Sequence, residues 1–176
     1  MAADKNMFLK NYYFYGKHAD MVVALTSSIE EDSGASIFNS FIELFVMAAI
    51  VGVIHNHRSK PDPDKGREKH IFAEQFNSHS HDVRLAFKFT LLLGNKEKYD
   101  DKARLNKTFR NPETDDNYKE FEEYMLGGLE DIYNKLMVDS NIRYEDYLTS
   151  VNQFLDEFKK DGDDGGDTIP STEDFF

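Results

Sequence analysis

The apolar block from Ile37 to Ile54, IFNSFIELFVMAAIVGVI, constrains the fold more than any other stretch of the sequence. Apolar residues recur within it at the i, i+3, i+4 and i+7 spacing of a helix, and others fill the remaining faces. A helix that is apolar on nearly every side has to be covered by several other elements. The block therefore predicts a central, buried helix over residues 37–54, capped by Ser36 or by the Asn39–Ser40 pair.

The same block is too short and too polar to predict a membrane span. It contains Asn39, Ser40 and Glu43, and an uninterrupted run of only 11 apolar or glycine residues follows them, whereas a spanning helix needs about 20. The first residues, MAADKNMFLKNYYFYG, also lack the cationic start and apolar run of a signal peptide. We therefore expect a cytoplasmic protein with no membrane contact. The absence of cysteine fits that location and excludes disulfides, thiolate zinc sites and a cysteine nucleophile.

The remaining periodicity predicts a mainly α fold, a single-domain helical bundle around the central helix. A chain of 176 residues fits one domain. Further helices are expected at residues 18–28, from Ser78 or Ser80 to Leu93, from about 112–116 to Leu136, and at about 143–159. Around residues 101–106 we expect either a mobile connection or a short helix. The aromatic segment 8–15 and the segment 70–76 could add two short strands, which would form a small β-hairpin. We expect the helical domain to occupy residues 1–160 and a flexible tail to occupy residues 161–176.

Two adjacent glycines, Gly127 and Gly128, lie in the middle of the helix predicted at 115–136. Each glycine costs about 1 kcal/mol relative to alanine inside a helix. A close crossing with another helix would offset that cost. The small residues Ala48, Ala49 and Gly52 of the central helix are the natural counterpart.

The negative charge of the chain belongs to its C-terminal third. The formal net charge is −12, but residues 1–110 carry a balance of +2 and residues 111–176 a balance of −14. This asymmetry argues against nucleic-acid binding over the whole surface. The notable basic stretches are 58–69 and 102–110, which either contact phosphates or are ordinary solvated loops. Their candidate nucleic-acid-binding residues are Arg58, Lys60, Lys65, Arg67, Lys69, Lys102, Arg104, Lys107 and Arg110.

Two His-x-His pairs are weak candidates for metal ligands. His55 with His57 and His79 with His81 could together supply four imidazole nitrogens to zinc, iron or nickel. Residues at i and i+2 point apart on a helix, so chelation would require both pairs to lie in loops or at helix ends. The alternative is that these are solvated histidines at helix termini. We assign no metal and no cofactor.

Recognisable catalytic motifs are missing from the sequence. It has no glycine-rich phosphate loop, no H-E-x-x-H and no nucleophile elbow. Glu43 is the acid inside the central helix, and either a salt bridge or a solvent-exposed edge of that helix explains it better than catalysis does. Whether the chain is an enzyme stays open, with the balance against it.

The acidic C-terminal segment, DGDDGGDTIPSTEDFF, ends in Phe175 and Phe176. Its acids could steer it to a basic surface, and its two terminal rings could anchor it there. These two residues are therefore the candidate partner-binding residues. The alternative is a terminus without a partner.

Three segments of the chain together resemble a small protein family encoded beside bacterial DNA-phosphorothioation (Dnd) modification and restriction systems. They are Ile37-Phe38 with FIELFVMAAIVG and the basic turn HRSKP, then Ile71-Phe72 leading to a helix with Asp82 and an apolar run, and FEEY with GGLE in residues 121–130. The resemblance covers about residues 15–137. The helix at 143–159 and the acidic tail lie outside it and are expected to be additions.

This resemblance implies an accessory role in DNA modification-dependent defence, and it carries over no catalytic residue. The leading hypothesis is a non-enzymatic accessory or adaptor protein that acts through protein–protein contacts within a modification or restriction complex. One alternative is a metal-dependent nuclease or hydrolase that uses the histidine pairs with Glu43 or Asp82. The other is a direct DNA-binding module that uses the loops 58–69 and 102–110.

Overall fold

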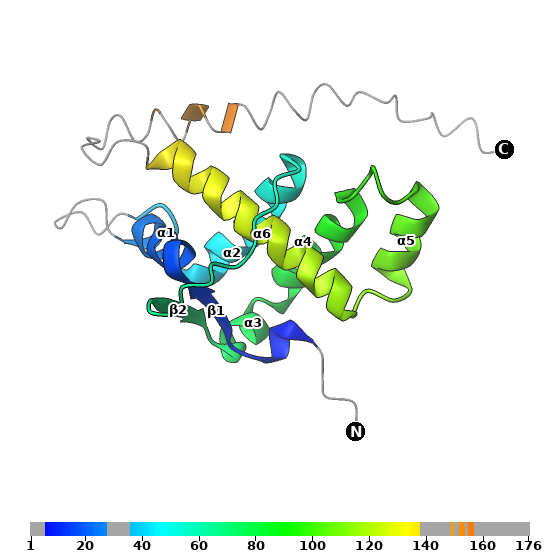
Figure 1. Cartoon of the computed structure of the whole chain (residues 1–176), viewed down its shortest axis with the longest axis horizontal. Helices are drawn as coiled ribbons and strands as arrows, with labels where there is room; N and C mark the ends of the chain where they lie inside the picture. Colours follow the sequence, from blue (N-terminus) through cyan, green and yellow to red (C-terminus); the bar gives the residue numbers. More distant parts are fainter. Residues whose placement is uncertain (1–5, 28–35, 138–148, 150–151, 154, 157–176) are drawn as a thin grey trace. The chain divides into compact units, whose positions relative to one another are not determined.

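The computed structural model describes residues 6–27, 36–137, 149, 152–153 and 155–156 (Figure 1). The chain divides into two compact units, Met1–Val138 and Asp139–Phe176. In the second unit, the described residues are helical and lie within the helix predicted at 143–159. The rest of that helix, the boundary at residue 160 and the candidates Phe175 and Phe176 lie outside the described residues.

The described part of the first unit is mainly helical, which confirms the predicted fold class. In chain order its elements are a 3-10 helix η1 (Met7–Leu9), β1 (Tyr12–Tyr15), α1 (Gly16–Thr26), α2 (Phe41–Ile54), β2 (Glu68–Ile71), α3 (Ala73–Ser78), α4 (Ser80–Leu93), α5 (Asp101–Phe109) and α6 (Asp115–Leu136). None of the helices in these residues is both long and apolar enough to cross a bilayer.

Helix α2 is the central helix that the apolar block predicts. It packs against α1, α4 and α6, and α6 runs across it from the α1 side to the α5 side (Figure 1). Its inward residues Leu44, Phe45 and Ala48 are fully buried. The predicted start at residue 37 is four residues too early, because Ser40 is extended and its hydroxyl accepts a hydrogen bond from the Glu43 amide. Ser40 is therefore the N-cap.

The close helix crossing predicted from the glycines is confirmed. A Cβ atom at Gly52 would lie 1.8 Å from the Tyr124 carbonyl oxygen of α6. A Cβ atom at Gly128 would lie 1.9 Å from the Ala48 carbonyl oxygen of α2. Real Cβ atoms do not approach a carbonyl oxygen so closely, so the two backbones touch where neither helix has a side chain.

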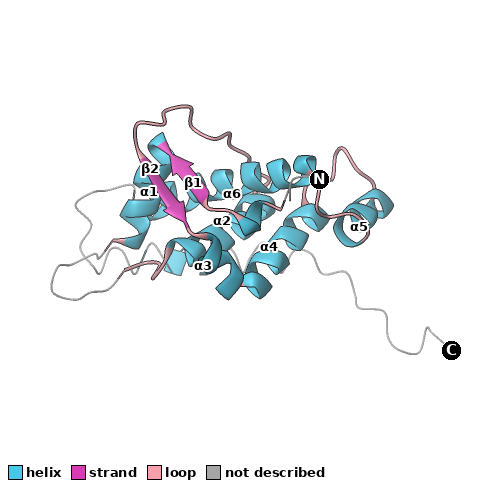
Figure 2. Ribbon diagram, turned by 90° about the horizontal axis from the view of Figure 1, so that it is seen from below, coloured by secondary structure: helices cyan, strands magenta, loops and turns pink. Residues whose placement is uncertain are grey.

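The small sheet pairs β1 with β2 antiparallel, with Tyr12 opposite Ile71 and Tyr15 opposite Glu68. Figure 2 shows the sheet beside α1 and α3 beside α4. Both predicted strands are shorter than expected. The start of the first predicted strand belongs instead to η1, which Asn6 caps. The second strand ends before Phe72, because Phe72 is the N-cap of α3. The chain between the two strands contains α1 and α2, so no tight turn closes the pair.

Aromatic rings fill the core between the sheet, α2 and α6. The Phe45 ring lies at its centre and makes edge-on or tilted contacts with Tyr12, Phe14, Phe76 and Phe121. Phe8 of η1 extends this cluster toward α4, where its ring centroid lies 5.5 Å from that of Phe87. Such pairs add to the apolar area that the rings bury. Aromatic residues of the segment 8–15 therefore pack in the core.

Candidate functional site

The end of α2 is fastened to α6 through the loop of residues 55–59, which we call the α2 loop. Asn56 has a positive φ of 51°, and the His57 amide donates to the Gly52 carbonyl at 2.9 Å. This is the Schellman arrangement that ends many helices, with asparagine in the left-handed position. The Tyr124 hydroxyl of α6 donates to the Asn56 side chain at 3.1 Å and accepts from the Asn95 amide at 3.0 Å.

Two further residues of α6, Gly127 and Glu123, hold the same loop. A Cβ atom at Gly127 would lie 2.2 Å from the His57 carbonyl oxygen, so the loop passes directly over this glycine. The Ser59 amide donates to the Glu123 carbonyl at 2.9 Å. The segments EEY and GGLE, which support the family resemblance, therefore have a structural explanation: they clamp α2 and its loop onto α6.

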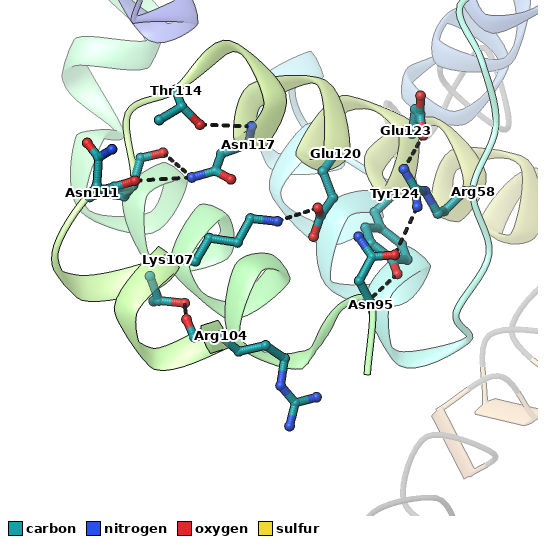
Figure 3. Close-up of polar contacts among 12 residues, drawn as sticks. Arg58, Asn95, Arg104, Lys107, Asn111, Thr114, Asn117, Glu120, Glu123 and Tyr124 are labelled. Atoms are coloured by element: carbon teal, nitrogen blue, oxygen red, sulfur yellow. Dashed lines mark hydrogen bonds and ion pairs between the residues drawn. The ribbon is translucent and has the colours of Figure 1, made fainter. Parts of the chain in front are cut away.

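A polar pocket of about 610 Å³ opens beside this clamp. Its walls are Arg58 of the α2 loop, the segment after α4 from Asn95 to Tyr99, α5, and the first turns of α6. Figure 3 shows side chains from these elements converging on the pocket. Asn117, which is buried, donates to the Asn111 and Pro112 carbonyls and so fixes the connection between α5 and α6.

Two buried carboxylates of α6 are paired with cations inside the pocket. Lys107 donates to Glu120, and Arg58 donates to Glu123 and to the Asn95 side chain (Figure 3). Glu120 and Glu123 are only 6% and 8% exposed. Buried carboxylates require such partners because an unpaired buried charge is costly. These pairs join α5 and the α2 loop to α6.

Three of the predicted nucleic-acid-binding residues meet at this pocket: Arg58, Lys107 and Arg110. The structure adds two lysines that sequence reasoning missed, Lys98 and Lys119. Lys119 had a signal in the sequence, because it lies on the same stretch of α6 as the acids Asp116, Glu120 and Glu123. Lys98 had none, since its segment reads as a polar connection.

The other predicted nucleic-acid-binding residues are not among those that line the pocket. Arg67 pairs with Asp20 of α1, and Arg104 pairs with Asp101 in its own helix. The remaining four, Lys60, Lys65, Lys69 and Lys102, are exposed. A role for the complete set in DNA binding stays a prediction.

A second polar network holds α1 and the α2 loop against the far part of α6. Glu130 accepts from Lys17 at 2.8 Å, from His18 Nε2 at 2.9 Å and from the Ser59 hydroxyl. Burial alone would raise the pKa of Glu130, but these hydrogen bonds outweigh it and lower the pKa to about 2. Burial lowers the pKa of His18, and its hydrogen bond to Glu130 only partly opposes this. His18 Nδ1 is buried with no hydrogen-bond partner among the described residues, which fits a neutral ring.

The four candidate metal ligands do not gather at one place. His55 and His57 both contact Asp131 of α6, at 2.9 and 2.7 Å. His79 instead contacts the Gln75 carbonyl and lies beside the first turn of α2, far along that helix from His55. His81 is exposed in the first turn of α4. Within the described ranges, no three histidine or acidic side chains are placed to hold a metal ion.

The network around Glu130 makes the stability of the protein depend on pH in the acid range. A carboxyl whose pKa falls from 4.5 to about 2 on folding stabilises the protein above pH 4.5, and that stabilisation disappears as the pH falls toward 2. His18 acts in the same direction below its ordinary pKa of 6.5, because the folded state disfavours its protonated form. We expect Glu130→Gln to lower the free energy of unfolding by on the order of 2 kcal/mol at pH 7. We also expect the variant to lose less stability than the native chain as the pH falls from 4.5 to about 2. Urea unfolding at a series of pH values checks this; an unchanged acid slope in Glu130→Gln would contradict it.

A family model described as DNA sulphur modification system-associated protein 4 matches residues 16–167. Searches among curated proteins and among solved structures returned no match. The matched range includes the helix predicted at 143–159, so the expectation that this helix is an addition outside the family pattern is wrong. The match spans most of the chain, which therefore belongs to the family of DNA sulphur modification system-associated protein 4, accessory to Dnd phosphorothioation systems.

Proposed function

We propose that this accessory protein acts through protein–protein contacts and not through catalysis. Its partner is another protein of a Dnd modification or restriction complex, and it works with that partner in the cytoplasm as part of a defence system. Family membership supports the association with such a system. The contact mechanism rests on one structural observation, an apolar groove on the central helix that the described residues leave open.

This groove has a volume of about 340 Å³ and lies along α2 on the side facing the start of α4. Its apolar lining consists of Phe38, Ile42, Val46, Met47 and Ile50. Met47 is 40% exposed, although it belongs to the most apolar of the described helices. A contiguous apolar surface of this kind is typical of a site that another protein covers.

The charged residues that line the groove indicate the chemistry of the partner segment. Glu43 and Asp82 line the groove beside its apolar wall, together with His79. A complementary segment would insert apolar side chains and place a lysine or arginine next to these acids. We therefore propose a partner segment that is apolar at its centre and basic at its edge, such as one face of an amphipathic helix.

Co-expression of the tagged chain with the proteins of its own Dnd locus tests this. We expect a locus protein to co-purify with the native chain and to be lost with Met47→Glu, which places a charge in the groove. Leu105→Glu is the matched control, because Leu105 is also about half exposed but lies on α5. Equal recovery of that protein with both variants, or recovery with neither the native chain nor the control, would refute a groove-mediated contact.

The C-terminal segment is a second proposed contact, through Phe175 and Phe176. Deletion of residues 161–176 in the same co-expression experiment separates it from the groove. Loss of the partner from the truncated chain would support a contact through this segment. Full recovery would leave the groove as the contact and remove the terminal residues from the proposal.

A further inference from the structure

The polar pocket beside the clamp carries more positive charge than its own ion pairs use. Five basic and three acidic residues line it. Two of those acids are already paired, Glu120 with Lys107 and Glu123 with Arg58. Lys98, Arg110 and Lys119 have no ion pair among the described residues and face only Asp116 as an additional acid. The pocket therefore has an excess of two positive charges.

That excess favours an anion, and the volume of the pocket favours one that is larger than a simple inorganic ion. Lysine and arginine are the side chains that bind phosphate oxygens in proteins. At about 610 Å³ the pocket has the size of a typical small-molecule site, which falls between roughly 300 and 1,000 Å³. An isolated phosphate would leave most of this space to water, so the ligand extends beyond its phosphate.

The other lining groups suit the edge of a nucleic-acid base. Asn95 and Asn106 offer amides, and amide and carboxylate side chains are among the groups that pair with base edges. Glu120 Oε1 is buried with no hydrogen-bond partner among the described residues, so it can accept from a ligand amino or hydroxyl group that reaches it. Tyr99, with Lys98 and Lys107 within about 5 Å of its ring centroid, adds an aromatic surface.

We infer that this pocket binds a nucleotide, with the phosphate on Lys98, Arg110 and Lys119 and the base against the amide-bearing wall. The nucleotide is either a free nucleoside phosphate or one unit of a DNA strand, since both present the same phosphate and base. This site is separate from the groove on α2 and goes beyond the contact function proposed above.

Calorimetric titration of the full chain at low salt tests the inference. The probes are the four deoxynucleoside 5′-monophosphates, a short single-stranded oligonucleotide and inorganic phosphate. The variant Lys98→Gln with Arg110→Gln and Lys119→Gln should weaken binding at least about tenfold, because all three phosphate-facing charges are lost. The matched control is Lys10→Gln with Arg84→Gln and Lys88→Gln, which removes the same charge from exposed residues outside the pocket and should leave the affinity unchanged. All six side chains are exposed, so both triple variants should keep the native melting temperature.

The probes separate the two sources of the nucleotide. Pocket-dependent binding of the monophosphates identifies a free nucleotide, and pocket-dependent binding of the oligonucleotide alone identifies a unit of DNA. Equal loss of affinity in both triple variants would reduce the effect to general charge and overturn the site. Equal affinity for inorganic phosphate, or no binding of any probe, would overturn it as well. Met47→Glu should bind the nucleotide normally, so failure here is distinguishable from failure of the groove proposal.

Discussion

Gly128→Leu is expected to lower the free energy of unfolding by about 3 kcal/mol or more, at the upper end of overpacking costs. A Cβ atom at this position would lie 1.9 Å from the Ala48 carbonyl oxygen and 2.5 Å from the Gly52 amide nitrogen. Both atoms belong to the backbone of α2, which cannot rotate away as a side chain could. The helices would have to separate, and the packing of α2 on α6 would be lost along the crossing.

Chemical denaturation of Gly128→Leu beside Gly66→Ala measures this effect with a control. A Cβ atom at Gly66 would meet only the exposed Asp64 carboxylate, at 3.1 Å. That substitution should change the free energy of unfolding by less than about 0.5 kcal/mol. Native stability in Gly128→Leu would show that the two helices do not touch at this glycine.

Phe45→Ala is expected to cost about 3–5 kcal/mol, the usual range for removing a fully buried phenylalanine. The Phe45 side chain is fully buried, and its ring contacts four other aromatic rings at centroid distances between 5.3 and 6.4 Å. The substitution leaves a cavity between the sheet, α2 and α6, and these elements meet around the ring. The surrounding rings cannot fill that space without losing their own contacts.

Phe109→Ala is the control for this prediction. Phe109 is also a phenylalanine in a helix, but it is 61% exposed and lies near the Lys88 ammonium group. We expect a change below about 1 kcal/mol, which is typical of an exposed aromatic with one cation–π contact. Thermal and urea unfolding of both variants provide the comparison. Similar losses in the two would contradict the assignment of Phe45 to the centre of the core.

The central helix and its crossing could be predicted because their causes are local in the sequence. Apolar spacing over residues 37–54 and the small residues Gly52, Gly127 and Gly128 identify a buried helix with a close neighbour. The predicted start of α2 is too early because Ile37 and Phe38 are apolar, whereas Ser40 is the residue that caps the helix. Apolar character alone does not distinguish a residue inside a helix from one just before it.

The polar pocket could not be predicted because its members come together only in three dimensions. Arg58 and Glu123 are 65 positions apart, and the segment carrying Lys98 has no periodicity that relates it to α6. The basic stretches 58–69 and 102–110 read as uniform charge runs in the sequence. In the structure their members divide between ion pairs, the pocket and exposed positions elsewhere.

The contacts of the histidines also could not be predicted from the sequence. Their spacing drew attention to metal binding, but the partners of His55 and His57 are decided by Asp131, far away in the sequence. His18 belongs to no sequence motif, yet it forms a hydrogen bond with Glu130, the carboxylate whose pKa is lowered to about 2. The spacing of the histidines in the sequence therefore does not predict their contacts, because the acids of α6 determine those contacts.

The most direct test of the central claim, that α2 presents a protein-binding groove, is a pair of binding isotherms. The purified native chain and its Met47→Glu variant are each titrated with the Dnd-locus protein that co-purifies with the native chain. We expect a saturable isotherm for the native chain and a loss of at least about tenfold in affinity for Met47→Glu, as for the loss of an apolar anchor. The Leu105→Glu control should bind like the native chain. Equal affinities for the native chain and Met47→Glu would contradict the claim.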